Sequence, residues 1–219
     1  ISTLDLDMKS HSLSVDSDPA IFYVQRWDTQ LNIHDAVNIE ATAHYGNIVY
    51  NSGNGNSISL QAQNDIRLTQ AEQKDSGASI TVSGGSELTL DAGHDIVLQN
   101  YGIYNTVGIG SKADVKMKAG NDIVFNNYSR GNMITVDEGP DFDEGGKLQM
   151  NAGHDITFNQ SDNDPQFASS LSLLSLDDYS DTTITAGNDI NFNRYKYSPF
   201  IDLYLSLIHI SEPTRRVVI

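Results

Sequence analysis

The chain has 219 residues, of which 38% are hydrophobic and 8% aromatic, and it carries a formal net charge of −16 with no cysteine. The lack of cysteine excludes a disulfide framework and a zinc site built from thiolates. The acidic balance speaks against nucleic acid and anionic lipid as partners, since both attract clusters of Lys and Arg. No run reaches the roughly 20 apolar residues of a membrane-spanning helix. The length suits one extended repeat domain with a thin core.

A single phrase recurs along the chain. Five close copies read QAQNDIRLTQ, DAGHDIVLQN, KAGNDIVFNN, NAGHDITFNQ and TAGNDINFNR, at 61–70, 91–100, 118–127, 151–160 and 185–194. Their aspartates are separated by 30, 27, 33 and 34 residues, and a looser copy that begins at Asp35 places Asn38 in the same position. Self-similarity at a period of about 20–50 residues indicates a solenoid or another repeat array.

Each copy alternates apolar and polar residues on both sides of a small-residue corner, as at Leu88, Leu90, Ile96 and Leu98. Period-two alternation indicates short strands with one buried face, and Gly, Asn and Asp indicate a tight turn. A second corner, at Gly84 and Gly85, adds another short strand in front. One period therefore predicts three short strands and a variable loop, the layout of a parallel β-helix with about six rungs. A propeller blade, the alternative at this period, needs four antiparallel strands.

The residue before the repeated aspartate is always asparagine or histidine. In the five close copies it is Asn64, His94, Asn121, His154 and Asn188. Asn and His share little catalytic chemistry, but both are enriched among non-glycine residues at positive φ. The preceding glycine tolerates the same backbone region, and it is present as Gly93, Gly120, Gly153 and Gly187. We therefore predict left-handed turn residues here and assign no catalytic, cofactor-binding or metal-binding role.

The repeated aspartate is also predicted to be structural. It occurs as Asp65, Asp95, Asp122, Asp155 and Asp189. If rungs stack at the strand spacing of about 4.8 Å, neighbouring carboxylates repel each other by about 0.9 kcal/mol even in bulk water. Backbone N–H groups at the corner could offset this repulsion, and so could a bound cation. We favour the backbone donors, expect no cofactor, and keep calcium as the alternative.

Tyrosines cluster in the loops that follow the third strand of a period. Tyr101, Tyr128 and Tyr195 share one register. They are the candidates for contact with a glycan or protein ligand. The alternative is that the rings only stack on one another and stiffen the edge of the solenoid.

Other polar segments match no catalytic motif. The insertion VDEGPDFDEGG (136–146) clusters acids and glycines, but it lacks the ligand spacing of an EF-hand, which favours a solvated acidic loop. The glycine-rich NSGNGNS (51–57) lacks the lysine and the following helix of a phosphate-binding loop.

The last residues depart from the repeat. The segment LSLIHISEPTRR (205–216) matches none of its pattern, and Leu205 to Arg215 closely resembles the conceptual translation of a transposase mosaic-end sequencing adapter. We therefore expect residues 205–219 to be a non-native tail. We expect residues 1–204 to be one β-helix repeat domain, a fragment truncated at both ends.

The AGNDIxFNN and AGHDIxFNQ phrases resemble those of bacterial surface passengers, namely autotransporter adhesins and filamentous-haemagglutinin-type exoproteins, over about residues 30–194. This resemblance implies a right-handed parallel β-helix, secretion through an outer membrane by a translocator outside this fragment, and a role in adhesion. Rungs of 27–34 residues are long for the haemagglutinin type, and the F-N-N and F-N-Q endings lean towards autotransporter passengers.

We expect a structural and adhesive segment of a secreted or outer-membrane-anchored bacterial protein, with a host or bacterial surface protein or glycan as its partner. The alternative is a β-helix polysaccharide lyase or hydrolase. Such an enzyme needs two or three carboxylates, or a basic partner, converging on one face of neighbouring rungs. The repeated aspartate instead sits at every corner and the basic residues are scattered, so we expect no enzyme.

Overall fold

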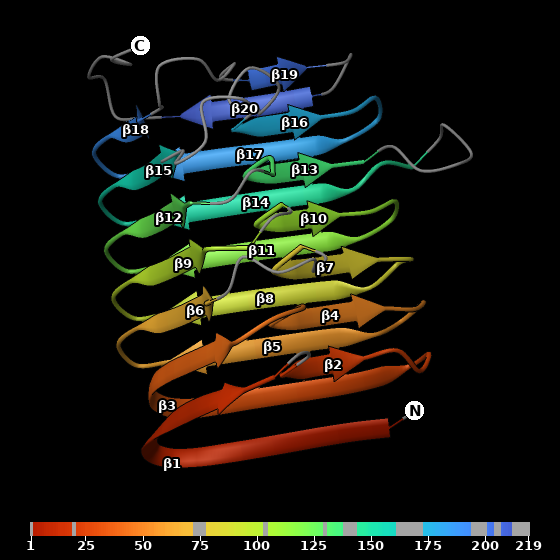
Figure 1. Ribbon diagram of the computed structural model, residues 1–219, viewed down its shortest axis with the longest axis vertical. Coiled ribbons are helices and arrows are strands. Elements are labelled where there is room, and N and C mark those ends of the chain that lie inside the picture. Colours follow the sequence, from red (N-terminus) through yellow and green to blue (C-terminus); the bar gives the residue numbers. More distant parts are fainter. Residues whose placement is uncertain are drawn as a thin grey trace.

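The computed structural model describes residues 2–18, 21–71, 78–102, 105–128, 131–137, 144–160, 173–193, 201–203 and 207–211. Within these ranges the chain forms strands and no helix, and the strands stack as a parallel β-helix of about six turns (Figure 1). The predicted fold class is therefore confirmed. Since the described part of the chain contains no helix, it also contains none that could cross a bilayer.

Each complete rung has three strands joined by two corners. The rungs are β4 (Val49–Ser52), β5 (Ser57–Ala62) and β6 (Ile66–Gln70); β7 (Ile80–Ser83), β8 (Glu87–Ala92) and β9 (Ile96–Asn100); β10 (Val107–Ile109), β11 (Asp114–Ala119) and β12 (Ile123–Asn127); β13 (Ile134–Val136), β14 (Lys147–Ala152) and β15 (Ile156–Gln160); and β16 (Leu174–Leu176), β17 (Asp181–Ala186) and β18 (Ile190–Asn193).

The two ends of the stack depart from this pattern. At the N-terminal end, β1 (Ser2–Ser17) pairs with β3 (Thr29–Ala43), and β3 pairs in turn with both β5 and β6, so it bends around the corner without a break. The short strand β2 (Phe22–Val24) precedes β3. At the other end, β19 (Ile201–Leu203) pairs with β16, and β20 (Leu207–Ser211) pairs with β17. Strand β20 lies inside the segment predicted to be a non-native tail.

The strands form two sheets whose pairs are all parallel. The first strands of the rungs make a seven-stranded sheet, and the second and third strands make a thirteen-stranded sheet whose two halves meet at β3. The register places equal positions of the repeat side by side. Ile66, Ile96, Ile123, Ile156 and Ile190 form one such column.

The core lies between the sheets and consists of these apolar columns. In most strands buried and exposed residues alternate strictly, as the period-two pattern predicts. The Phe125 and Phe158 rings stack with centroids 5.1 Å apart, and the Phe158 and Phe192 rings with centroids 4.9 Å apart. Burying one large apolar side chain contributes about 1.5–3 kcal/mol. A lone rung exposes its apolar face, so this contribution depends on stacking.

A buried polar column at the end of the third strands was not predicted. It consists of Gln70, Asn100, Asn127 and Gln160. Their amides bond to one another and to the adjoining loops. For example, Asn127 Nδ2 donates to Gln160 Oε1 at 2.8 Å, and Gln70 Nε2 donates to the Gly46 carbonyl at 2.8 Å. Buried amides must be bonded in this way because an unpaired polar group is costly in the core.

Candidate functional site

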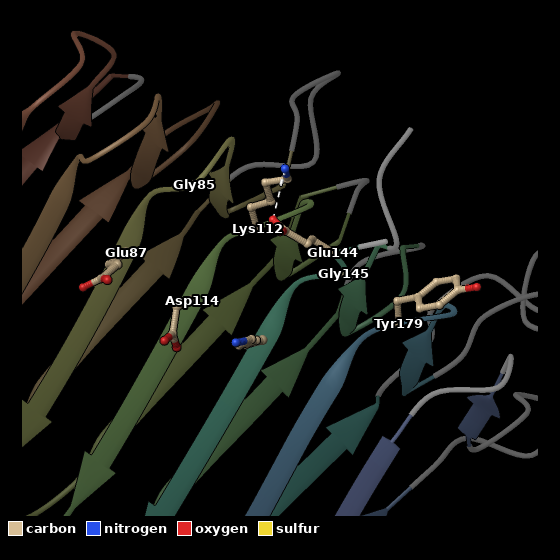
Figure 2. Close-up of a pocket in the computed structure, with 8 residues that line it drawn as sticks. Gly85, Glu87, Lys112, Asp114, Glu144, Gly145 and Tyr179 are labelled. Carbon is tan, nitrogen blue, oxygen red and sulfur yellow. Dashed lines mark ion pairs between the residues drawn. The ribbon is translucent and has the colours of Figure 1, made fainter. Parts of the chain in front are cut away.

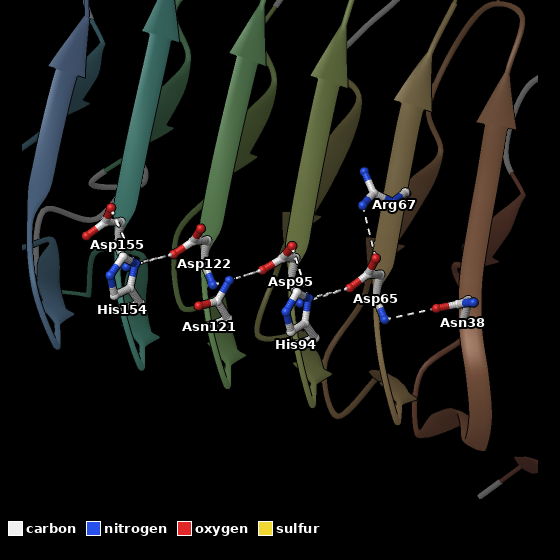
Figure 3. Close-up of polar contacts among 9 residues, drawn as sticks. All are labelled: Asn38, Asp65, Arg67, His94, Asp95, Asn121, Asp122, His154 and Asp155. Atoms are coloured by element: carbon white, nitrogen blue, oxygen red, sulfur yellow. Dashed lines mark hydrogen bonds and ion pairs between the residues drawn. The ribbon is translucent and has the colours of Figure 1, made fainter.

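The repeated aspartates form a column at the corner between the second and third strands (Figure 3). Each Oδ1 atom accepts the backbone N–H of the aspartate one rung further on. The four N···O distances, from Asp95, Asp122, Asp155 and Asp189 as donors, are 3.1, 3.0, 2.9 and 3.0 Å. Asn38 Oδ1 accepts the Asp65 N–H at 3.1 Å and begins the column. The carboxylates therefore accept backbone donors, which belong to the neighbouring rung.

The residue before each aspartate bridges two carboxylates of consecutive rungs. His94 Nδ1 lies 3.2 Å from Asp65 Oδ1 and 3.1 Å from Asp95 Oδ2. The amide of Asn121, in the next rung, donates to Asp95 Oδ1 at 2.9 Å. An imidazole N–H and an amide N–H can fill the same position, which explains why His and Asn alternate there.

His154 and Asn188 repeat this alternation higher in the stack. His154 Nδ1 lies 3.1 Å from Asp122 Oδ1 and 3.4 Å from Asp155 Oδ2. Asn188 Nδ2 donates to Asp155 Oδ1 at 2.9 Å. Two corners of the described chain thus hold a histidine between two carboxylates.

The prediction of left-handed residues at this corner is wrong. Among the described residues, the positive-φ positions next to a strand–strand corner include Gly84, Gly85, Lys112 and Tyr179, which lie at the other corner, between the first and second strands. None of the five Asn or His residues has positive φ. The spacing pattern pointed to a tight turn but not to its handedness.

The glycines of the aspartate corner are needed for a different reason. A Cβ atom on Gly93 would lie 2.0 Å from the Gln63 carbonyl oxygen, and one on Gly120 would lie 2.1 Å from the Gly93 carbonyl oxygen. Gly153 and Gly187 show the same approach. Stacked corners pack backbone against backbone here, so only glycine fits.

The first carboxylate of the column has a perturbed pKa. Burial alone would raise the pKa of Asp65, but hydrogen bonds from Arg67, the Asp95 N–H and His94 outweigh burial and lower it. Arg67 Nη2 lies 3.0 Å from Asp65 Oδ2. The histidine rings remain open to solvent, since 59% of the His94 side chain and 54% of the His154 side chain are exposed.

The tyrosines predicted to contact a ligand stack on each other where the structure describes them. The rings of Tyr101 and Tyr128 lie 4.6 Å apart at an interplanar angle of 3°. Burial, with Tyr128 next to it, raises the pKa of Tyr101. Tyr195 lies outside the described residues. This stacking is the structural alternative stated above, and ligand contact by these tyrosines stays a prediction.

A second aromatic group, near the N-terminal end, was missed from the sequence. Tyr23 and Tyr50 are register partners in β2 and β4, with ring centroids 5.0 Å apart. Trp27 is 74% exposed and Tyr23 is 50% exposed. The available signal was a tyrosine at the middle of both first strands, in rungs where this strand carries no repeated phrase.

A hollow of about 400 Å³ crosses several rungs at the corner between first and second strands (Figure 2). Glu87, Asp114 and Lys147 line it from the first positions of β8, β11 and β14, which are register partners. Lys112 and Glu144, which also line it, form an ion pair with an Nζ–Oε2 distance of 3.0 Å.

The hollow gathers basic residues that the sequence suggested were scattered. Lys112 and Lys147 share it with three carboxylates, because equal positions of rungs about 30 residues apart become neighbours. The exposed Tyr179 ring stands at one end. Mixed charge and an aromatic ring suit a polar ligand that can both donate and accept hydrogen bonds.

Comparison of the chain with protein-family models, with curated proteins and with solved structures found no match, so an assignment of function depends on the fold and on these contacts.

Proposed function

We propose that the chain is a structural and adhesive segment of a secreted bacterial surface protein, of the passenger type. The β-helix fold is consistent with such segments and with β-helix enzymes. The observation that carries the proposal is how the repeated side chains are used. The aspartates bond from rung to rung, and the phenylalanines and tyrosines stack from rung to rung. Repetition that serves stacking supports a scaffold that holds contact surfaces apart.

The exposed aromatic group at the N-terminal end supports the adhesive part of the proposal. Trp27 and the Tyr23–Tyr50 stack present broad, rigid ring surfaces on the outside of the first rungs. Such rings bury much apolar area at little entropic cost and keep a polar edge for hydrogen bonds. A glycan or a protein of a host or bacterial surface is the partner that they fit.

Binding of the labelled chain to arrayed glycans and to fixed epithelial and bacterial cells tests this proposal. We expect a variant with Tyr23→Ser and Trp27→Ser to lose binding while its circular dichroism spectrum and thermal midpoint stay unchanged. Tyr45→Ser is the matched control, because Tyr45 is also an exposed tyrosine, at 41%. Equal binding by both variants, or no binding of the parent chain to any of these surfaces, would contradict the proposal.

The mixed-charge hollow favours a second candidate, a polysaccharide-degrading β-helix enzyme. Glu87 and Asp114 place carboxylates on adjacent rungs, and Lys147 adds a cation on the next rung. Carboxylates on neighbouring strands can divide general-acid and general-base work, and a lysine can bind the carboxylate of an acidic sugar.

Incubation with pectin, alginate and heparin distinguishes the two candidates. The enzyme predicts new reducing ends or the ultraviolet absorbance of unsaturated sugars, and it predicts their loss in Asp114→Asn. The adhesive proposal predicts no product from any of these substrates and unchanged cell binding by Asp114→Asn.

A further inference from the structure

We propose that two corners of the aspartate column each bind a divalent first-row transition-metal ion, with Zn²⁺ as the representative. The first set of ligands is Asp65, His94 and Asp95, and the second is Asp122, His154 and Asp155. In each set one imidazole nitrogen and two carboxylate oxygens lie within 4.8 Å of one another. This inference is independent of the adhesive function proposed above.

The distances within each set fit a common ion. Zinc binds nitrogen and oxygen at about 2.0–2.2 Å, so two ligands of one ion at angles of about 90–109° lie roughly 3.0–3.4 Å apart. His94 Nδ1 lies 3.2 Å from Asp65 Oδ1 and 3.1 Å from Asp95 Oδ2.

The second set repeats this geometry. Its nitrogen–oxygen distances, from His154 Nδ1 to Asp122 Oδ1 and to Asp155 Oδ2, are 3.1 and 3.4 Å. When the ion binds, the neutral imidazole carries its proton on Nε2 and presents the lone pair of Nδ1.

The backbone holds both carboxylates in place. Asp65 Oδ1 accepts the Asp95 N–H, and Asp95 Oδ1 accepts the Asp122 N–H, which leaves Asp95 Oδ2 facing His94. Ligands fixed by such bonds lose little freedom when the ion arrives. The exposed rings leave room for an ion to enter from solvent and for water to complete its coordination.

The nitrogen ligand decides between classes of ion. Calcium takes six to eight oxygen ligands, whereas imidazole with carboxylate suits zinc and its neighbours in the transition series. The corners that carry Asn121 and Asn188 provide a natural comparison. Each places an amide nitrogen beside the preceding carboxylate, and an amide nitrogen is no metal ligand.

The two sets differ in one nearby charge. Arg67 pairs with Asp65 in the first set, and the register places Val97 and then Val124 at the same position of the next two rungs. A cation beside the first set repels a metal ion. We therefore expect the second set to bind zinc more tightly, and Arg67→Thr to strengthen binding at the first.

Titration of the full chain with ZnCl₂, followed by calorimetry and thermal unfolding, tests the proposal. The parent chain should bind two ions and show a higher thermal midpoint with zinc but not with calcium. His94→Asn and His154→Asn should each bind one ion, and the double variant should bind neither. These variants reproduce the residue found at the neighbouring corners, so we expect them to fold.

Two single-carboxylate pairs, His34 with Asp5 and His44 with Asp16, remain in the double variant and report adventitious binding. Zinc binding that falls to this background in the double variant supports the two sites. Zinc binding that is equal in the parent chain and the double variant, or a parent chain that binds none, overturns the proposal.

Discussion

At the scale of single residues, Gly120 marks the closest packing between stacked corners. An added Cβ would lie 2.1 Å from the Gly93 carbonyl oxygen, and the partner is backbone that cannot rotate away. We expect Gly120→Ala to lower the free energy of unfolding by about 3 kcal/mol, because the two rungs must separate locally. Urea unfolding followed by circular dichroism measures the change.

Gly108→Ala is the control for this prediction. A Cβ on Gly108 would meet the Ala78 Cβ at 3.6 Å, an ordinary contact. This variant should change stability by less than about 1 kcal/mol, and the reduced freedom of the unfolded chain favours a small gain. Equal losses at Gly108 and Gly120 would show that close approach at the corner is not the reason for its glycine.

A second residue-scale prediction concerns the aspartate column. Asp122→Ala leaves the Asp155 N–H without its acceptor and should cost about 1–3 kcal/mol. Asp122→Asn should cost less than about 1 kcal/mol, because Asn38 already accepts the Asp65 N–H with an amide oxygen. Thermal and urea unfolding in the presence of a chelator compare the two variants without a metal contribution. Similar losses would contradict a role based on the acceptor oxygen.

At the scale of strands, the sequence predicts the fold well because one period-two face is buried in every rung. The Ile66-to-Ile190 column could be foreseen from the repeated phrase. The handedness of the corners could not, since a short Gly-Asx segment is compatible with several turns. The hollow lined by Glu87 and Lys147 depends on which rungs become neighbours, and residues about 30 positions apart carry no local signal of contact.

Thr182 offers a prediction at the strand scale. It pairs with Leu148 in a buried column of β14 and β17, and its hydroxyl is buried with no hydrogen-bond partner. Thr182→Val keeps the shape of the side chain and removes the unpaired hydroxyl. We expect a gain of about 1 kcal/mol in the free energy of unfolding. Thr183→Val, at the neighbouring half-exposed position of the same strand, should show no comparable gain, and a loss in Thr182→Val would contradict the prediction.

At the scale of the whole molecule, stacking makes stability close to a sum over rungs and their interfaces. Deleting residues 95–121 removes one period of 27 residues and joins His94 to Asp122. Strand β12 then takes the place of β9 beside β6, and β13 takes the place of β10 beside β7, with the columns in register. We expect this shortened chain to keep its β spectrum and cooperative unfolding.

The measured quantity is the dependence of unfolding free energy on urea, which scales with the surface exposed. Removing one of about six turns should lower this slope by roughly one sixth. Deleting residues 95–107 removes about half a period, so β11 would follow the aspartate corner where a third strand belongs. The half-period chain should lose its cooperative transition, because its apolar columns no longer meet. A shortened whole-period chain that unfolds without cooperativity would show that the rungs depend on contacts beyond their neighbours.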